Sequence, residues 1–172
     1  SRRQRQMCIR DSYKNTFSVI FDIQPELYEY CIVKLVLQPI LENAINYGVG
    51  SMDDCGEIKV TGRMQGENII LSVTDNGLGM TEEEVDLILT DSKRIRKHGS
   101  GVGLVNVNNR IQILFGKEYG LVVESEPDEG TTVSICIPAV LYTEDNREDL
   151  EKGRMFRKEE TAKEVQVKRD DE

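Results

Sequence analysis

The stretch DNGLGM at residues 75–80 decides which fold the sequence predicts. It directly follows residues 68–74, an apolar segment typical of a strand. Asp75 therefore ends a strand, where a carboxylate is costly unless a donor binds it, and the amino group of a flat heterocycle is a suitable donor. Gly77 and Gly79 permit positive φ angles and the close approach of a ligand to the backbone. Taken alone, an ordinary glycine-rich turn between a strand and a helix is the simpler explanation.

A second glycine cluster, GSGVGL at residues 99–104, lies just before a predicted helix whose first large apolar residue is Leu104. The unpaired N–H groups and the helix dipole at such a position suit a phosphate group. Gly99, Gly101 and Gly103 follow a GxGxG spacing with no strand directly before it, which differs from the dinucleotide-binding GxGxxG pattern. A flexible hinge is the alternative interpretation.

Polar residues gather at the end of the clearest predicted helix, residues 33–47. Asn43, Asn46 and Tyr47 are three and four residues apart, so an α-helix would carry them on one face. Amide oxygens are suitable ligands for Mg²⁺ that also binds phosphate and water. A solvated helix end is the alternative. Pro39 lies inside the helical pattern and predicts a bend or a local irregularity there.

Two further groups of residues are candidates for contact with a ligand. The loop predicted at residues 90–101 carries a basic run suited to polyphosphate, namely Lys93, Arg94, Arg96, Lys97 and His98. A merely solvated loop is an equal alternative, and we assign no catalytic role to His98. Thr131 and Thr132 begin the last predicted strand, where their hydroxyls would reach a ligand at the end of the sheet. The alternative for both is an ordinary strand-opening threonine.

The order of the elements follows from hydrophobic spacing and from start and stop residues. Gln65-Gly66-Glu67 predicts a hairpin turn, Thr81 and Glu84 a capping box, and Gly116 a helix end. The chain then reads strand, helix, two strands, helix, loop, helix and two strands, at residues 17–21, 33–47, 57–63, 68–74, 81–89, 90–101, 103–115, 121–123 and 132–137. This order predicts a mixed sheet with helices on one face.

Composition narrows the possible functions. The chain has 172 residues, a formal net charge of −9 and a sequence pI near 4.8, which argues against binding to nucleic acid. Its 4 cysteines are widely spaced and predict reduced thiols rather than a zinc site. No apolar stretch is long enough to insert in a membrane. Because the chain begins with Ser1, we expect it to be a piece of a longer protein.

The order and spacing of these motifs together resemble the ATP-binding domain of the GHKL superfamily, which includes gyrase, Hsp90, histidine kinases and MutL. Within it, LQPILENAI at residues 37–45 resembles the sensor histidine kinases of the YesM/LytS-like subgroup, as do residues 99–104, Asn106-Val107 and Arg110. The segment from Arg10 to Ile23 also resembles the region leading into that domain. The resemblance covers roughly residues 10–140.

The resemblance implies an α/β sandwich of the Bergerat type, in which a mixed, mostly antiparallel sheet is backed by helices and a mobile lid covers ATP. Residues 13–141 would form this domain, residues 1–12 the end of an upstream linker or helix, and residues 142–172 a charged tail, disordered or a solvated helix. The lid would be residues 90–101.

The resemblance also implies a role for each candidate residue. Asn43 would hold Mg²⁺ and Asp75 would accept the adenine amino group. The adenine pocket would be shaped by Gly77 and Gly79, with Thr131 or Thr132 near the base. The triphosphate would be lined by Gly99, Gly101, Gly103 and Leu104.

Two positions depart from the family pattern. The position of Asn46 is commonly Lys in the family, where it supports a phosphate, so a lid cation would have to replace it: Lys93, Arg94, Arg96 or Lys97. Tyr47 stands where the subgroup often has His, and its ring would still stack near the nucleotide.

The implied activity is transfer of the γ-phosphoryl group of ATP to a histidine, with Glu42 polarising the acceptor imidazole. The acceptor of the family lies in an upstream dimerisation segment, in a motif resembling Pro-His-Phe that is absent here. The partners would be that segment and a response regulator, and the domain would be cytoplasmic in a parent protein anchored in the bacterial membrane. A serine kinase of the anti-sigma type and a non-catalytic nucleotide sensor are alternatives. A clamp like Hsp90 is disfavoured because Gln38 occupies the place of its hydrolytic glutamate.

Overall fold

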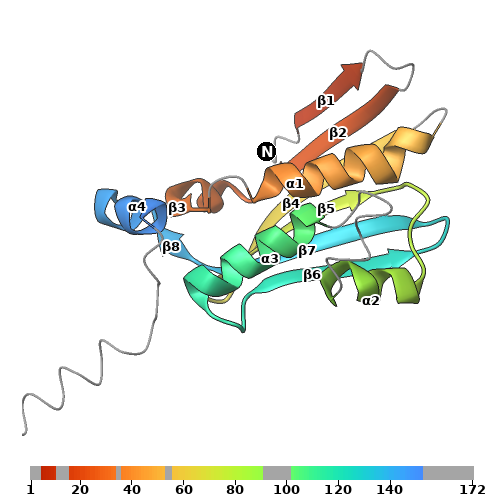
Figure 1. The fold of residues 1–172 in the computed structure, drawn as a ribbon. Helices are drawn as coiled ribbons and strands as arrows, with labels where there is room; N and C mark the ends of the chain where they lie inside the picture. The colour runs from red at the N-terminus through yellow and green to blue at the C-terminus, as the bar shows by residue number, and fades with distance from the viewer. Residues whose placement is uncertain (1–4, 11–15, 34–35, 53–55, 91–101, 153–172) are drawn as a thin grey trace, which may run out of the picture.

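A computed structural model describes residues 5–10, 16–33, 36–52, 56–90 and 102–152, and it consists of a sheet with a layer of helices on one face (Figure 1). The six-stranded sheet has the order β1-β2-β4-β5-β7-β6. Its strands are β1 (Arg5–Arg10), β2 (Thr16–Ile23), β4 (Gly56–Gln65), β5 (Asn68–Asp75), β6 (Gly120–Glu126) and β7 (Gly130–Pro138). The β2–β4 pair is parallel and the other pairs are antiparallel, which confirms the predicted mixed sheet.

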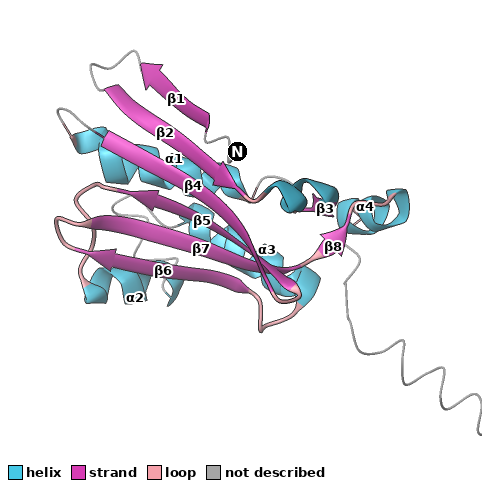
Figure 2. Ribbon diagram, turned by 180° about the vertical axis from the view of Figure 1, so that it is seen from behind, coloured by secondary structure: helices cyan, strands magenta, loops and turns pink. Residues whose placement is uncertain are grey.

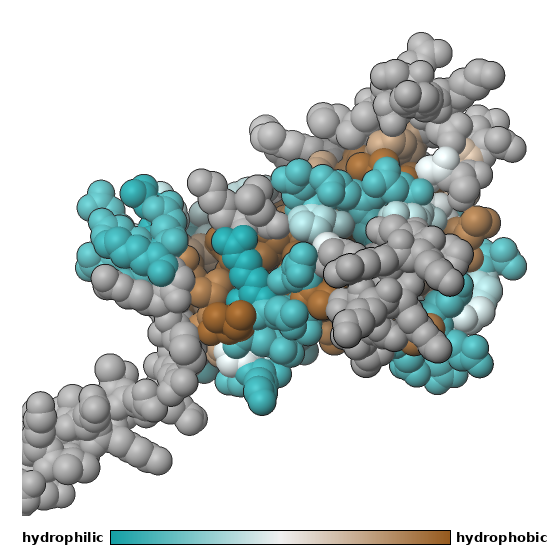
Figure 3. Space-filling model, in the orientation of Figure 1, coloured by the Kyte–Doolittle hydropathy of each residue, from teal (hydrophilic) through white to brown (hydrophobic). Residues whose placement is uncertain are grey.

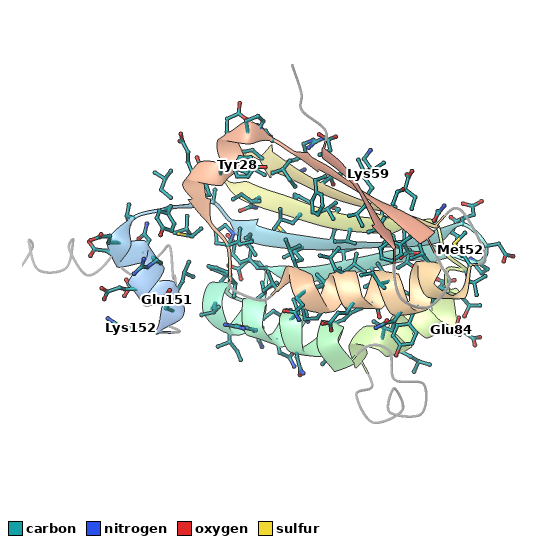
Figure 4. The ribbon with its side chains drawn as sticks, turned by 90° about the horizontal axis from the view of Figure 1, so that it is seen from above. Tyr28, Met52, Lys59, Glu84, Glu151 and Lys152 are labelled. Atoms are coloured by element: carbon teal, nitrogen blue, oxygen red, sulfur yellow. The ribbon has the colours of Figure 1, made fainter. Side chains whose placement is uncertain are left out.

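The helices α1 (Leu37–Asn43), α2 (Glu82–Thr90) and α3 (Val102–Phe115) all lie on the same side of this sheet, behind it in Figure 2. Along β4, β5 and β7, side chains alternate between buried and more exposed positions, as a sheet covered on one face requires. The buried side chains meet apolar residues of α1 and α3, including Ile40 and Ile111. Lys59, on β4, points away from the helices (Figure 4). The two-layer α/β architecture is therefore the predicted one.

Several local predictions are confirmed by the backbone. Gln65 pairs with Asn68 across a two-residue turn in which Gly66 has a φ of +61°, so β4 and β5 form the expected hairpin. Thr81 and Glu84 form the capping box, because each backbone N–H is bonded by the other side chain, at 2.9 and 3.4 Å. Gly116, with a φ of +111°, follows the last residue of α3.

The prediction for the first long helix is wrong at its start. The helix begins at Leu37 rather than at residue 33, so Pro39 lies in the first turn, where a missing N–H breaks no intrahelical bond. No bend is needed at Pro39. The irregularity comes later, because Ala44–Gly48 form a π-helix (η2) and Val49–Ser51 a 3-10 turn (η3).

The strand at the start of the described chain was not predicted from the sequence, whereas a solvated helix was one of the two forms expected for the tail. Residues 5–10, expected to end an upstream helix or linker, form β1 instead and pair with β2. The open edge of β2 offers unpaired backbone groups, which any sequence can bond. At the other end, Thr143 caps α4 (Glu144–Glu151), which is the solvated-helix form of the tail. It lies beside a small sheet of β3 (Tyr30–Cys31) and β8 (Val140–Leu141), next to the 3-10 turn η1 (Pro25–Glu29).

Candidate functional site

The carboxylate of Asp75 stands at the end of β5, among backbone groups rather than in water. Asp75 is only 5% exposed, and its Oδ1 accepts a hydrogen bond of 2.9 Å from the N–H of Gly77. Burial raises the pKa of Asp75 above its usual value, and hydrogen bonds from the backbone of Gly77 and Thr131 lower that pKa in part. A buried acceptor of this kind is a place where a ligand with N–H groups gains binding energy.

The end of the π-helix closes one side of this site. A Cβ atom at Gly48 would overlap the Asp75 carboxyl group, and one at Gly77 would overlap the backbone of Gly48. Two glycines therefore let the helix end rest directly on the strand end. Gly77 was among the predicted site residues. Gly48 was not among the predicted site residues, because a glycine at the end of a predicted helix is most often only its C-terminal stop.

The β6–β7 hairpin holds the other side of the DNGLGM stretch. The N–H of Asp128 donates to the carbonyl of Leu78 at 2.7 Å, and the N–H of Met80 donates to the Ser125 hydroxyl at 2.8 Å. Gly79 has a φ of +66°, and a Cβ atom there would overlap the carbonyl oxygen of Glu126. Gly79 therefore serves both the backbone conformation and the close approach of the turn. Ser125 was also missed by the sequence analysis.

The two threonines of β7 point to opposite faces of the sheet. Thr131 pairs with Asp75 in the β5–β7 register and is buried with it on the helical side. Thr132 is more exposed, and its hydroxyl bonds that of Thr74 at 3.0 Å on the face turned away from the helices. The sequence left both residues open as neighbours of the base. Thr131 alone shares the face of Asp75, although Thr132 also lines the hollow at this end of the sheet.

The same end of the sheet carries a hollow of about 630 Å³, lined among others by Asp75, Ser125, Gly130 and Thr131. In Figure 4, Glu84 and Met52 lie toward this end of the molecule, whereas Glu151 at the end of α4 and the following Lys152 lie at the other end. A larger hollow of about 870 Å³ lies beside α4, where Figure 3 shows hydrophobic surface between α4 and the other helices. That second hollow contains none of the predicted site residues.

The polar helix end differs from the prediction in its geometry. Asn43 is half-buried at the last position of α1, whereas Asn46 and Tyr47 are exposed in the π-helix. The α-helical spacing that put all three on one face does not apply, because a π-helix turns more slowly per residue. Glu42 is exposed beside Asn43, and the Gln38 amide donates to its Oε1 at 2.9 Å.

The start of α3 rests against α1. A Cβ atom at Gly103 would lie 3.1 Å from the Cβ of Pro39, which is closer than ordinary van der Waals contact, so a glycine lets the two helices approach here. Leu104 is 1% exposed and belongs to the core between the helices and the sheet. The last glycine of the second cluster, Gly103, therefore packs against α1, the helix that carries Asn43. The other predicted phosphate-binding residues lie outside the described part of the chain: Lys93, Arg94, Arg96, Lys97, Gly99 and Gly101.

Residues 32–141 match the family model described as histidine kinase-, DNA gyrase B- and HSP90-like ATPase. The chain belongs to this family. The match contains the helices α1 and α3 and the strands β5 and β7, which carry Asp75 and Thr131. Binding of ATP is therefore the property that the family membership establishes, and the expected fold class agrees with the described sheet and helices.

Two relatives place the chain near the YesM/LytS-like sensor kinases. It is 32% identical over 130 residues to the sensor histidine kinase YesM of Bacillus subtilis, covering 75% of this chain and 21% of YesM. It is 34% identical over 126 residues to the sensor protein LytS of Staphylococcus saprophyticus, covering 73% of this chain and 21% of LytS. The chain thus spans about a fifth of the length of each of these relatives.

Among solved structures, the catalytic domain of the histidine kinase ThkA matches with a TM-score of 0.47 and 22% identity. The match covers 63% of this chain and 65% of that domain. In the described part of this chain, no helix has the length and apolar character needed to cross a membrane.

The pKa of Asp75 gives a prediction about stability. Because burial raises this pKa, the folded state holds the Asp75 proton more tightly than the unfolded state. The ionised carboxylate therefore destabilises the folded state at pH values above the pKa that Asp75 has when folded. This destabilisation is lost as the pH falls through that pKa. We expect the wild-type free energy of unfolding, measured in urea, to rise relative to that of Asp75→Asn as the pH falls from 7 toward 4.

The matched control is Asp145→Asn, which makes the same change at an exposed position on α4. Its difference from the wild type should stay nearly flat over that pH range. A wild type that loses stability relative to Asp75→Asn on acidification would contradict the prediction.

Proposed function

We propose that this chain is the catalytic domain of a two-component sensor histidine kinase, which transfers the γ-phosphoryl group of ATP to a histidine outside the chain. The observation that carries the proposal is the buried Asp75 carboxylate, which has glycine backbone packed around it. The carboxylate would accept a hydrogen bond from the adenine amino group, and Gly77 and Gly79 would let the base approach the backbone. Neighbouring Thr131 would lie beside the base.

Magnesium would be held through Asn43. Its amide oxygen is a hard neutral ligand, and its half-buried place at the end of α1 lies on the helix against which the second glycine cluster ends. When bound, Mg²⁺ would neutralise charge on the phosphates. Asn46 carries no charge for the phosphates, so the cations of residues 93–97 would take that part, with the glycines of residues 99–103 along the triphosphate. Exposed Tyr47 would stack near the nucleotide.

In the transfer step, the acceptor imidazole nitrogen forms a bond to the γ-phosphorus. The bond from that phosphorus to the bridging oxygen breaks, and ADP leaves with the electron pair. As this bond forms, the proton on the other ring nitrogen of the imidazole passes to solvent, and Glu42 is the group that we assign to polarising that N–H. Two observations support this role: Glu42 is exposed to an incoming partner, and Gln38 orients its carboxylate through a hydrogen bond of 2.9 Å.

The acceptor histidine would belong to a helical dimerisation segment of the parent protein, and a response regulator would receive the phosphoryl group from it. This assignment is supported by the similarity to relatives named sensor histidine kinase and sensor protein. The domain would work in the cytoplasm, in a parent protein anchored in the bacterial membrane.

Nucleotide binding tests the role of Asp75. Replacing it by Asn removes the charged acceptor, so we expect ADP affinity to fall about tenfold to a hundredfold, the scale of one hydrogen bond to a charged group. Isothermal titration calorimetry measures the change. Asp145→Asn should bind ADP like the wild type, and an unchanged affinity in a folded Asp75→Asn protein would exclude the adenine assignment.

A second measurement concerns magnesium. We expect Mg²⁺ to strengthen ATP binding by the wild type, and Asn43→Ala to lose most of this gain while its affinity for ADP without Mg²⁺ changes little. Asn46→Ala is the matched control and should retain the gain. If Asn43→Ala responds to Mg²⁺ as strongly as the wild type does, Asn43 is not a ligand.

Phosphoryl transfer itself is tested with γ-labelled ATP. The chain alone should remain unlabelled, and addition of the parent protein's dimerisation segment should give acid-labile label on that segment. Acid-stable label would instead indicate a serine kinase, because phosphoserine survives acid. Acid-labile label on the chain alone that disappears in His98→Gln would show that the acceptor lies within this chain.

A further inference from the structure

The hydroxyl of Ser125 makes three hydrogen bonds that tie the DNGLGM stretch to β7. Its Oγ accepts from the N–H of Met80 at 2.8 Å and donates to the carbonyl oxygen of Gly130 at 2.9 Å. It also lies 2.8 Å from Oγ1 of Thr131, a contact in which either hydroxyl could be the donor. The half-buried Ser125 therefore stands between the backbone around Asp75 and the threonine that pairs with it.

Counting protons settles the direction of the third bond. A serine hydroxyl has one proton to donate and two lone pairs to accept with. The carbonyl of Gly130 can only accept, so it takes the Ser125 proton. The N–H of Met80 can only donate, so it takes one lone pair. The remaining lone pair faces Thr131, and Thr131 must therefore be the donor in the bond between the two hydroxyls.

This direction decides what Thr131 offers to a ligand. Its one proton is committed to Ser125, so toward the hollow it has only lone pairs. Asp75 is directly opposite in the β5–β7 register and, when ionised, also only accepts. The Cβ atoms of two directly opposite residues lie about 5 Å apart, so one small group on a ligand can contact the side chains of both Asp75 and Thr131. Both residues then match an amino group, whereas a carbonyl oxygen would face lone pairs.

We infer that Ser125 is a positioning residue for base selection: by holding the Thr131 proton, it keeps the base site acceptor-only and selects 6-aminopurine nucleotides over 6-oxopurine nucleotides. This inference rests on the proposed binding of adenine nucleotide beside Asp75. It assigns the selectivity to two side chains acting together, since Ser125 orients the hydroxyl that Thr131 presents. Without the Ser125 lone pair, the Thr131 hydroxyl is free to rotate and to donate to a 6-oxo group.

The test compares ADP with inosine diphosphate, which carries a 6-oxo group in place of the amino group and a proton on N1. Calorimetry gives both dissociation constants for the full chain and for Ser125→Ala, Ser125→Thr, Thr131→Val and the double variant Ser125→Ala/Thr131→Val. In the wild type we expect ADP to bind much more tightly. In Ser125→Ala the ratio of the two constants should fall about tenfold, the scale of one hydrogen bond gained or lost.

Three comparisons separate this role from a structural one. Ser125→Thr keeps a hydroxyl and should keep the wild-type ratio. Thr131→Val removes the acceptor and should lower the ratio even if Ser125→Ala fails to fold. Because Ser125 acts through Thr131, adding Ser125→Ala to Thr131→Val should leave the ratio unchanged.

Other outcomes overturn the inference. A merely structural role would weaken ADP and inosine diphosphate equally and leave the ratio at its wild-type value. A further fall of the ratio in the double variant would show that Ser125 does not act through Thr131. If the wild type prefers ADP but Ser125→Ala leaves the ratio unchanged, this inference is wrong and the proposed function still stands. If the wild type binds neither nucleotide, the proposed function fails and the inference fails with it.

Discussion

The burial of one carboxylate at a strand end constrains the whole site. Asp75 is enclosed by the π-helix end, by its own following turn and by β7, and each of these approaches requires a residue without a side chain. Gly48 rests on the carboxyl group, Gly77 rests on Gly48, and Gly130 lies against the Asp75 carbonyl. The backbone amides that surround the charge offset part of its desolvation, although the raised pKa shows that they do not offset all of it.

The topology brings these segments together. The parallel pairing of β2 with β4 requires a crossover, and that crossover contains α1 and the π-helix. It therefore delivers Gly48 to the start of β4, beside the end of β5. The antiparallel β6–β7 hairpin delivers Ser125 and Thr131 to the same end from the opposite side. Sites built in this way need no long side chains, because backbone and short hydroxyls already hold the groups in place.

Local patterns predicted the elements, and non-local contacts explain what was missed. The capping box at Thr81, the turn at Gly66 and the end of α3 at Gly116 each depend on a few neighbouring residues, so the sequence revealed them. Gly48 and Ser125 matter through residues 27 and 45 positions away, Asp75 and Met80 respectively, and no periodicity reports such contacts. The sequence also could not choose between Thr131 and Thr132, because that choice depends on the register between β5 and β7. The π-helix was hidden for a related reason, since its residues also fit an α-helical pattern.

The buried carboxylate of Asp75 destabilises the fold, which points to a role in binding. An apolar residue at position 75 would continue the buried alternation of Ile69, Leu71 and Val73 and would avoid the penalty of a desolvated charge. The carboxylate instead interrupts that pattern at its last position, where the hollow begins. The backbone N–H groups offset only part of the desolvation penalty of the Asp75 carboxylate. A ligand amino group would donate a further hydrogen bond to it, so binding would offset more of that penalty. Local conflicts with the rules of folding concentrate at functional sites for this reason.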